Sequence, residues 1–313
     1  MRKSGLYSSE RINLKAPLGG AFLGGNMQIQ FTKMHGTGND YVYVDCTQGE
    51  LPEPGKISEY VSRQHFSIGS DGLIMICKSD VADFKMRMFN ADASEGKMCG
   101  NGIRCVAKYV YDHQLTDKTT IKIETLAGIK TIEVKVKEGK VMSAKVDMGE
   151  PIFRCTEIPM ISDHYVFVDQ GLAMDVTQNE VYNGTAISMG NPHYVIFVDD
   201  VDKFPVTELG PRIEKHHLFP EGVNVEFVQV IDNNTVKFRV WERGSGETMA
   251  CGTGACAVCV ASNMLGRAGK QGEPLTVICK GGTLTITHGK ENHVYMEGPA
   301  EEAFKGTVEI PEK

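Results

Sequence analysis

The chain lacks an excess of positive charge and lacks any long apolar run. Lys and Arg total 33 against 40 Asp and Glu, which gives a formal net charge of −7 at pH 7. Nucleic acids and anionic membranes attract basic patches, so this balance argues against both kinds of partner. No apolar stretch approaches the ~18 to 20 residues that a membrane-spanning helix requires. We therefore expect neither a nucleic-acid nor a membrane partner.

The sequence also has little from which to build a disulfide framework or a zinc site. Its nine cysteines are an odd number, and no secretory apolar segment is present. The only Cys-x-x-Cys pair, Cys256 and Cys259, lies in an apolar stretch with no second pair or His-x-x-x-His nearby. These absences predict free thiols in a reducing, cytoplasmic compartment, and no metal.

Residues 1–26 differ in composition from the rest of the chain. They hold four basic residues against one acid, beside scattered serines and a Gly-rich run at 17–25. Two interpretations stay open. One is a disordered extension or an upstream start codon, and the other is an organelle transit segment, which is typically basic, serine-bearing and poor in acids. Fold-like patterning begins only at Met27.

A length of 313 residues suggests two domains, and the chain repeats itself at an offset of 152. Cys251 minus 152 is Cys99, and the Gly-x-Gly that follows each cysteine coincides as well. Residues 237–241 fall on residues 85–89 at the same offset, without a gap. So many matches at one register predict two homologous halves.

Each half is predicted to be a curved, mostly antiparallel sheet wrapped around one buried helix, an α/β (α+β) fold with two pseudo-symmetric domains. β-branched, aromatic and alternating residues indicate strands, and apolar residues at helical spacing indicate helices. The segment 255–264 is apolar nearly all round, which predicts burial on every side. The predicted strands are 27–33, 41–46, 72–78, 84–89, 120–126, 130–136, 141–148, 185–188, 194–198, 224–230 and 236–241, with helices after Gly102 and at 255–264.

The boundary between the halves is predicted at residues 149–151, a Gly-Glu-Pro sequence. The first domain would comprise residues 27–148 plus 299–313, because the strand-like tail at 304–310 could return to it. The second domain would comprise residues 149–298. The oligomeric state is left open by these patterns, and a homodimer is one possibility.

Cys99 and Cys251 each precede a Gly-x-Gly at the predicted start of a buried helix. Unpaired backbone N–H groups and the positive end of the helix dipole lie there and favour thiolate and bound carboxylate. We therefore expect the pKa of each thiol to fall from ~8.5 towards neutrality. A lone helical cysteine is more often structural, and we assign Cys105, Cys256 and Cys259 that role.

Two facing halves would bring both thiols to one cleft from opposite sides. A thiolate could then remove an α-proton while the other thiol protonates the far face, which is what inversion of a stereocentre needs. The two helix N termini would hold the α-carboxylate and the developing enolate-like charge.

Four segments resemble the diaminopimelate epimerase family. They are residues 31–40 (FTKMHGTGND), 98–105 (MCGNGIRC), 189–193 (MGNPH) and 241–254 (WERGSGETMACGTG). The resemblance runs in order from Met27 to about Ile310. It implies the two-domain, pseudo-symmetric fold of that family. It also implies interconversion of LL- and meso-diaminopimelate, a small-molecule substrate, without pyridoxal phosphate or metal, on the route to lysine.

By position, the resemblance implies that Cys99 and Cys251 are the two acid/base thiols. The backbone N–H groups of Gly100, Asn101, Gly252 and Thr253 are implied to bind the reacting carboxylate, and Asn39, Asn90, Asn191, Asn224, Glu242 and Arg243 to contact the substrate. The distal end of the substrate is itself an amino acid. Arg243 can therefore take its carboxylate in a two-point fork, while Glu242 accepts from its ammonium.

Some positions are assigned no part in this site. The histidines His35, His65, His193 and His217 are predicted to be structural. Gly72 stands where some family members carry glutamine, so no side-chain contact is expected there.

Several alternatives stay open. A racemase for another amino acid, such as histidine or proline, could use the same thiols, although Arg243 beside Glu242 favours a distal zwitterion. An isomerase of this fold that uses a carboxylate would lack the thiol pair. A non-catalytic paralogue could merely hold diaminopimelate, but degeneration usually removes one thiol first and both are present.

Overall fold

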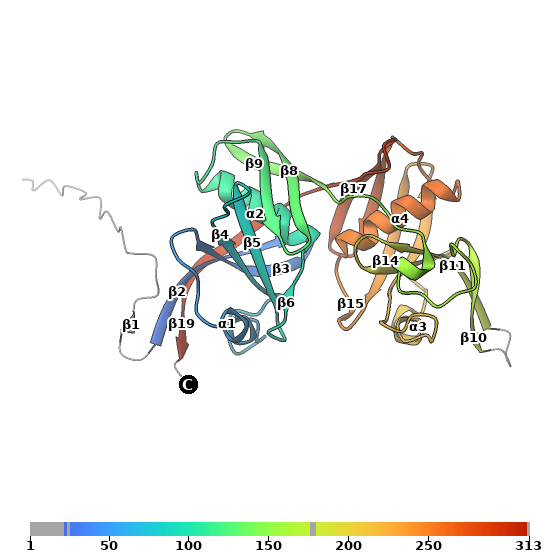
Figure 1. The fold of residues 1–313 in the computed structure, drawn as a ribbon, viewed down its shortest axis with the longest axis horizontal. Coiled ribbons are helices and arrows are strands. Elements are labelled where there is room, and N and C mark those ends of the chain that lie inside the picture. The colour runs from blue at the N-terminus through green and yellow to red at the C-terminus, as the bar shows by residue number, and fades with distance from the viewer. Residues whose placement is uncertain (1–21, 24–25, 176–179, 312–313) are drawn as a thin grey trace, which may run out of the picture.

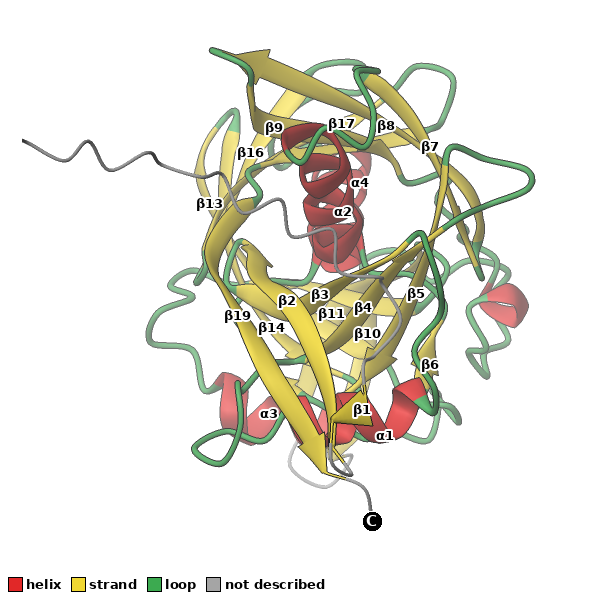
Figure 2. Cartoon of the chain, turned by 90° about the vertical axis from the view of Figure 1, so that its left-hand side faces the viewer, coloured by secondary structure: helices red, strands yellow, loops and turns green. Residues whose placement is uncertain are grey.

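The computed structural model describes residues 22–23, 26–175 and 180–311, which form two lobes of similar build (Figure 1). Each lobe encloses one long helix, α2 (Gly100–Asp112) in the first and α4 (Gly252–Met264) in the second. Figure 2 shows both helices surrounded by strands. The predicted fold class, two pseudo-symmetric halves each wrapped around a buried helix, is confirmed.

The first lobe follows the predicted order of strands. Its elements are β2 (Asn26–Gly36), β3 (Asn39–Cys46), α1 (Pro54–Val61), β4 (Gly72–Cys77), β5 (Phe84–Asn90), β6 (Glu95–Gly96), α2, β7 (Thr120–Thr125), β8 (Gly128–Lys137) and β9 (Lys140–Asp147). The short strand β1 (Phe22–Leu23) pairs with β2. Strand pairing therefore starts before Met27, and residues 1–21 and 24–25 lie outside the described residues.

The second lobe repeats this order. Its elements are the 3₁₀ turn η1 (Cys155–Glu157), β10 (Gln170–Asp175), β11 (Glu180–Ser188), β12 (Pro192–Phe197), α3 (Val206–Glu214), β13 (Asn224–Asp232), β14 (Thr235–Glu242), β15 (Gly246–Glu247), α4, β16 (Pro274–Cys279), β17 (Gly282–His288) and β18 (Val294–Gly298). Both ends of α4 lie 152 residues after those of α2. Residues that correspond at the 152 offset in the sequence therefore occupy equivalent helices in the two lobes.

The sheets are mostly antiparallel, as predicted, with the same exceptions in both lobes. The parallel pairs are β3 with β4 and β5 with β7 in the first lobe, and β12 with β13 and β14 with β16 in the second. In α4 every residue from Ala255 to Ala261 is fully buried. The all-round apolar character of this helix therefore matches its all-round enclosure.

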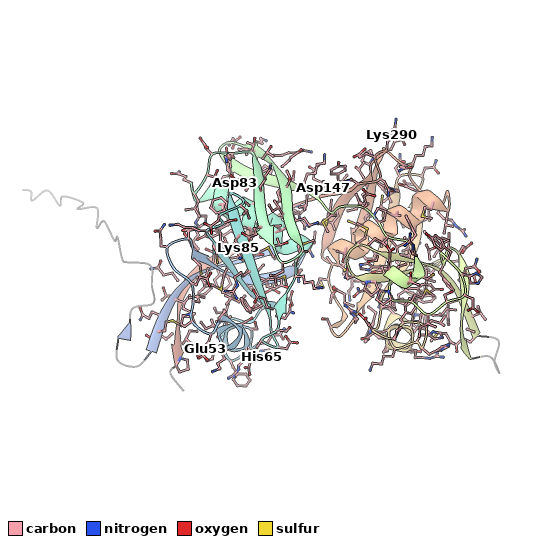
Figure 3. All side chains as sticks on the ribbon, viewed as in Figure 1. Glu53, His65, Asp83, Lys85, Asp147 and Lys290 are labelled. Atoms are coloured by element: carbon pink, nitrogen blue, oxygen red, sulfur yellow. The ribbon has the colours of Figure 1, made fainter. Side chains whose placement is uncertain are left out.

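The chain crosses between the lobes twice. The first crossing follows β9, where Gly149 takes a φ of 87° that favours glycine. The second leads from β18 into β19 (Glu301–Pro311), which pairs along the length of β2 and so confirms the predicted return of the tail. Because β18 also pairs with β9, the two lobes share backbone hydrogen bonds where they meet. Asp147, the last residue of β9, lies between the lobes in Figure 3.

Several elements were not predicted from the sequence. They are the helices α1 and α3, strand β10, the short strands β1, β6 and β15, and the β16–β18 meander. No helix in the described part of the chain has the length and apolar character that spanning a membrane requires.

Met296 lies fully buried where the lobes meet, and its removal should loosen that contact. We expect Met296→Ala to lower the free energy of unfolding by about 2–5 kcal/mol, because it leaves a cavity between packed elements. Urea denaturation measures this loss. The control is Met142→Ala, whose side chain is 58% exposed. Equal stabilities of the two variants would contradict the packing role of Met296.

Candidate active site

Cys99 and Cys251 occupy the same position in their helices, since each is the N-cap residue. Both have extended backbone, with φ/ψ of −128°/118° and −111°/113°. The Cys99 sulfur accepts a hydrogen bond from the Gly102 N–H at 3.3 Å, and the Cys251 sulfur accepts one from the Gly254 N–H at 3.4 Å. Both thiols therefore face the free N–H groups of a first helical turn, as predicted.

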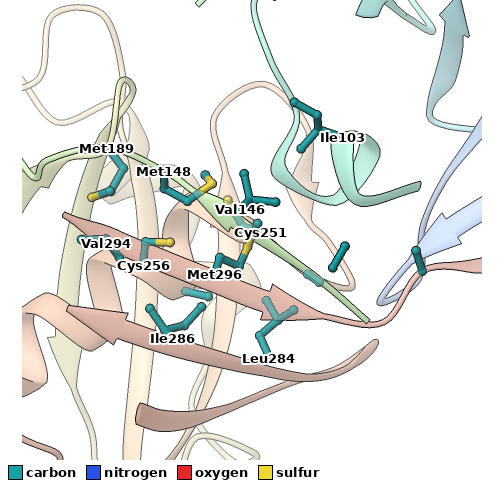
Figure 4. Packing of buried hydrophobic residues seen from close by; sticks show 14 of the residues in the cluster. Ile103, Val146, Met148, Met189, Cys251, Cys256, Leu284, Ile286, Val294 and Met296 are labelled. Atoms are coloured by element: carbon teal, nitrogen blue, oxygen red, sulfur yellow. The ribbon is translucent and has the colours of Figure 1, made fainter. Parts of the chain in front are cut away.

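The first turns of α2 and α4 meet at the junction of the lobes. The Asn101 side chain donates to the Ala250 carbonyl at 3.2 Å. A Cβ on Gly100 would lie 2.7 Å from Met296 Cε, and a Cβ on Gly252 would lie 3.0 Å from Met296 Sδ. Met296 thus packs against both helix starts (Figure 4), and the glycine after each cysteine leaves room for it.

Both thiols are held in their protonated form. Burial is the largest cause and raises the pKa of Cys99, although the N–H groups of Gly102 and Asn101 act against it. Burial raises the pKa of Cys251 further, to well above its ordinary value. The prediction that the helix N terminus lowers both thiol pKa values is therefore wrong in its net direction, because desolvation of the thiolate outweighs the N–H donors.

Glu242 acts electrostatically on both thiols. After burial, its charge is the next cause that raises the pKa of Cys251, and it also raises the pKa of Cys99. Burial raises the pKa of Glu242 itself, while a hydrogen bond from the Thr248 hydroxyl lowers it. One carboxylate at the end of β14 thus influences thiols from both lobes.

A buried, hydrogen-bonded histidine–glutamate pair lies beside Cys251 and was not predicted. His193 Nδ1 is 2.7 Å from Glu226 Oε1, both side chains are fully buried, and the charge of Glu226 also raises the pKa of Cys251. Sequence analysis assigned His193 a structural role and did not single out Glu226. Comparison at the 152 offset would have drawn attention to them, because Tyr41 and Ile74 stand at the corresponding positions.

This cluster has the composition of a metal site. Among the described residues, His193, Glu226 and Cys251 are the one group of potential ligands with suitable spacing, their ligand atoms lying within 4.8 Å of one another. Both ring nitrogens of His193 already face oxygen acceptors, Glu226 Oε1 and Asn191 Oδ1 at 3.0 Å. His193 is thus held through both ring nitrogens, while Glu226 Oε2 is buried without a hydrogen-bond partner.

Cys99 is hydrogen-bonded to one of the predicted asparagines. Its Sγ donates to Asn39 Oδ1 at 3.2 Å, and Asn39 Nδ2 donates to Asp71 Oδ2 at 2.6 Å. Asn39 opens β3 and therefore reaches the start of α2 from the sheet. Asp71, which precedes β4, was not predicted to belong to the site.

The second lobe brings Asn224 and Arg243 together. Asn224 Oδ1 accepts from the Arg243 backbone N–H at 2.9 Å, and Asn224 Nδ2 donates to the Pro192 carbonyl at 2.9 Å. The exposed Arg243 guanidinium donates to the Glu221 carbonyl at 2.9 Å. Within the described residues it forms no ion pair with a carboxylate, so its charge is open to an anionic ligand.

Asn90 and Gly72 are the remaining positions considered from the sequence, and the structure places them in different surroundings. Asn90, at the end of β5, donates to Ser94 Oγ at 2.9 Å, and among the described residues it forms no hydrogen bond with either thiol. A Cβ on Gly72 would lie only 2.1 Å from the Phe89 carbonyl oxygen. The backbone here excludes a side chain, which agrees with the expectation that Gly72 makes no side-chain contact.

The described structure shares its sequence signature with known proteins. The family model for diaminopimelate epimerase matches residues 31–154 and 185–302. The diaminopimelate epimerase of Methanococcus maripaludis (strain S2) is 54% identical over 283 residues, which cover 90% of this chain and 100% of that protein. The chain belongs to the diaminopimelate epimerase family.

A second relative and two solved structures extend this comparison. The enzyme named diaminopimelate epimerase in Acetivibrio thermocellus is 52% identical and covers 91% of this chain, with all of that protein matched. Among solved structures, a hydroxyproline epimerase from Agrobacterium vitis superposes with a TM-score of 0.63 at 14% identity, covering 91% of this chain and 92% of that one. A Bacillus anthracis phenazine biosynthesis protein of the PhzF family has a TM-score of 0.67 at 20% identity, covering 90% of this chain and 99% of that one. These two structures establish the shared fold.

Replacing Glu242 should make Cys99 easier to ionise. Cys99 is only partly buried, whereas the other eight cysteines are buried, so it should be the first to react with iodoacetamide. Because the Glu242 charge raises the Cys99 pKa, Glu242→Gln should shift the pH midpoint of this reaction downward by about half a unit. Mass spectrometry of the labelled peptide measures the shift. The exposed Glu221→Gln serves as the control, and an equal shift there would contradict the assignment.

Proposed function

We propose that the protein is a diaminopimelate epimerase that interconverts LL-2,6-diaminopimelate and meso-diaminopimelate by a two-thiol mechanism. The observation that carries this proposal is the matched placement of Cys99 and Cys251 as N-caps of two helices whose first turns meet. Pseudo-symmetry directs the two sulfurs at a common centre from opposite lobes. One thiolate removes the Cα proton, and the other thiol protonates the opposite face.

The helix starts supply the electrostatic part of the reaction. Negative charge moves from Cα into the adjacent carboxylate when the proton leaves. The N–H groups of Gly100, Asn101, Gly252 and Thr253 stand in the first turns of their helices, where intrahelical acceptors are lacking. Donors held in place before the reaction stabilise such developing charge without reorganising, which lowers the barrier.

The raised thiol pKa values determine when the base forms. In the free protein both sulfurs carry protons, because burial disfavours a thiolate in either place. An amino-acid substrate brings an ammonium group into the same buried space. A cation there stabilises a thiolate and lowers the pKa of the sulfur beside it. One thiol then releases its proton to solvent water as substrate arrives, while the other keeps the proton it has to deliver.

The distal end of the substrate supports diaminopimelate over other amino acids. The Arg243 guanidinium has no carboxylate partner within the described residues, and Asn224 holds its backbone in place. Glu242 and the neighbouring asparagine carbonyls can accept from a distal ammonium. A racemase for histidine or proline on the same scaffold remains the alternative, but neither substrate has the distal zwitterion that this pair of charges fits.

The proposal extends to the setting of the reaction. The family supports a role in lysine biosynthesis. The nine cysteines, all of them free in the structure, support a cytoplasmic location, and a homodimer stays a prediction.

Loss of either thiol should abolish turnover. In deuterated water without pyridoxal phosphate, the protein should place deuterium at Cα of diaminopimelate but not of histidine or proline. Cys99→Ala and Cys251→Ala should each lower the rate of epimerisation by at least about 100-fold, because one of the two proton carriers is missing. Proton NMR measures the exchange. Cys155→Ala, a buried cysteine in the separate core of the second lobe, is the matched control. Exchange on histidine or proline instead would support the two-thiol mechanism with another substrate. Exchange on none of these amino acids would refute the proposed catalytic activity.

Arg243 should determine affinity for the distal carboxylate. We expect Arg243→Met to lower kcat/KM for diaminopimelate by about 10- to 100-fold, since a charge-assisted, two-point contact is lost. Arg243→Lys should recover only part of this, because an ammonium cannot form the fork. Steady-state kinetics measure both variants beside Arg154→Met, an exposed arginine that pairs with Glu157. Unchanged kinetics in Arg243→Met would exclude the assigned contact.

A further inference from the structure

A short hydrogen-bond chain leads from an acidic side chain to the Cys99 thiol. Asp71 Oδ2 accepts from Asn39 Nδ2 at 2.6 Å and from the Asp40 backbone N–H at 3.0 Å. Asn39 Oδ1 in turn accepts from Cys99 Sγ at 3.2 Å. Because β3 and β4 are parallel neighbours, the start of β3 at Asn39 and the residue before β4 at Asp71 lie at the same edge of the sheet.

The chemistry of the groups fixes the direction of this chain. An ionised carboxylate only accepts hydrogen bonds, so the amide nitrogen of Asn39 must face Asp71. The amide oxygen then faces the sulfur. A protonated thiol can donate to that oxygen, whereas a thiolate would face an acceptor on the side of Asn39. The orientation of one amide group thus favours the S–H form of Cys99.

We propose that Asp71 is a positioning residue that locks the Asn39 amide with its carbonyl towards Cys99 and so keeps Cys99 as a hydrogen-bond donor until substrate binds. Its catalytic meaning rests on the proposed function. The ammonium group of an amino-acid substrate is a stronger donor than a thiol. When it takes the Asn39 oxygen, the sulfur loses its acceptor and can release its proton to solvent water.

In the described structure, orientation of the asparagine amide by a carboxylate occurs in the first lobe only. At the 152 offset Asp71 corresponds to Val223, which has no acceptor to offer, and Asn39 corresponds to Asn191. Asn191 Oδ1 lies 3.0 Å from His193 Nε2, so a ring nitrogen rather than a carboxylate fixes that amide. The two equivalent asparagines are therefore oriented through opposite ends of their amide groups. Asp71 is one of the residues that make the two thiols chemically different.

Other charged and titratable groups also act on Cys99, and the test has to separate them from Asp71. They are Tyr41, Tyr43, Arg104, Cys105 and Glu242. None of these forms a side-chain hydrogen bond with Cys99 in the described structure, where the sulfur contacts Asn39 Oδ1 and the N–H groups of Gly102 and Asn101. A variant at Asp71 should therefore act on Cys99 through Asn39, although it also removes a charge that raises the pKa of Tyr41.

The test is the pH dependence of iodoacetamide labelling at Cys99 in the full-length protein. In Asp71→Asn the amide of Asn39 is free to turn its N–H₂ to the sulfur and stabilise the thiolate. We expect the labelling midpoint to fall by about half to one pH unit. Asp40→Asn is the matched control, because it removes the neighbouring carboxylate, which pairs with Lys33 instead of Asn39.

A double-mutant cycle then decides whether Asp71 works through Asn39. In an Asn39→Ala background, Asp71→Asn should produce no further shift, since no amide remains to be oriented. Three results would overturn the proposal: an unchanged midpoint in Asp71→Asn, an equal shift in Asp40→Asn, or a shift that persists in Asn39→Ala. Labelling needs no turnover, so it separates this proposal from the proposed function. If diaminopimelate failed to exchange but the labelling midpoint shifted as expected, the proposed substrate would be rejected and the positioning role of Asp71 would be kept.

Discussion

The structure depends on one constraint: two helix N termini, each capped by a cysteine, have to meet where the lobes join. Each cap places a sulfur against free N–H groups, and the glycine behind it leaves room for Met296 between the helices. The pairing of β9 with β18 holds the lobes in the register that this contact requires. The rest of each sheet serves to enclose a helix so that only its first turn faces the junction.

Pseudo-symmetry of the backbone does not extend to the electrostatics. Cys251 lies under the influence of two carboxylates, Glu242 and Glu226, which raise its pKa beyond the effect of burial. Cys99 has a neutral asparagine beside it. Burial raises its pKa, and the positive charge of Arg104 acts against this rise. A duplicated fold thus offers two thiols at equivalent positions with different proton affinities. An epimerase whose two substrates are diastereomers has to handle two unequal faces, and this inequality suits that task.

The sequence was sufficient wherever local patterns determine structure. The 152 offset predicted the equivalence of α2 and α4, because the cysteine caps and their glycines keep register. The helices α1 and α3 escaped prediction because neither has a side-chain cap and α3 contains Pro211. The His193–Glu226 pair spans 33 residues and forms only because β12 and β13 pair in parallel. The direction of the thiol pKa shifts was mispredicted, since desolvation depends on tertiary enclosure.

The most direct test of two thiols acting on opposite faces is where deuterium appears during early turnover in deuterated water. The isomers of diaminopimelate would be separated after a few per cent conversion, and the deuterium content of each would be measured by mass spectrometry. The account predicts deuterium at Cα of the newly formed isomer, while recovered substrate stays protiated, because the incoming proton comes from the other sulfur. Label that enters the recovered substrate as fast as the product would contradict it and indicate a single base that serves both faces.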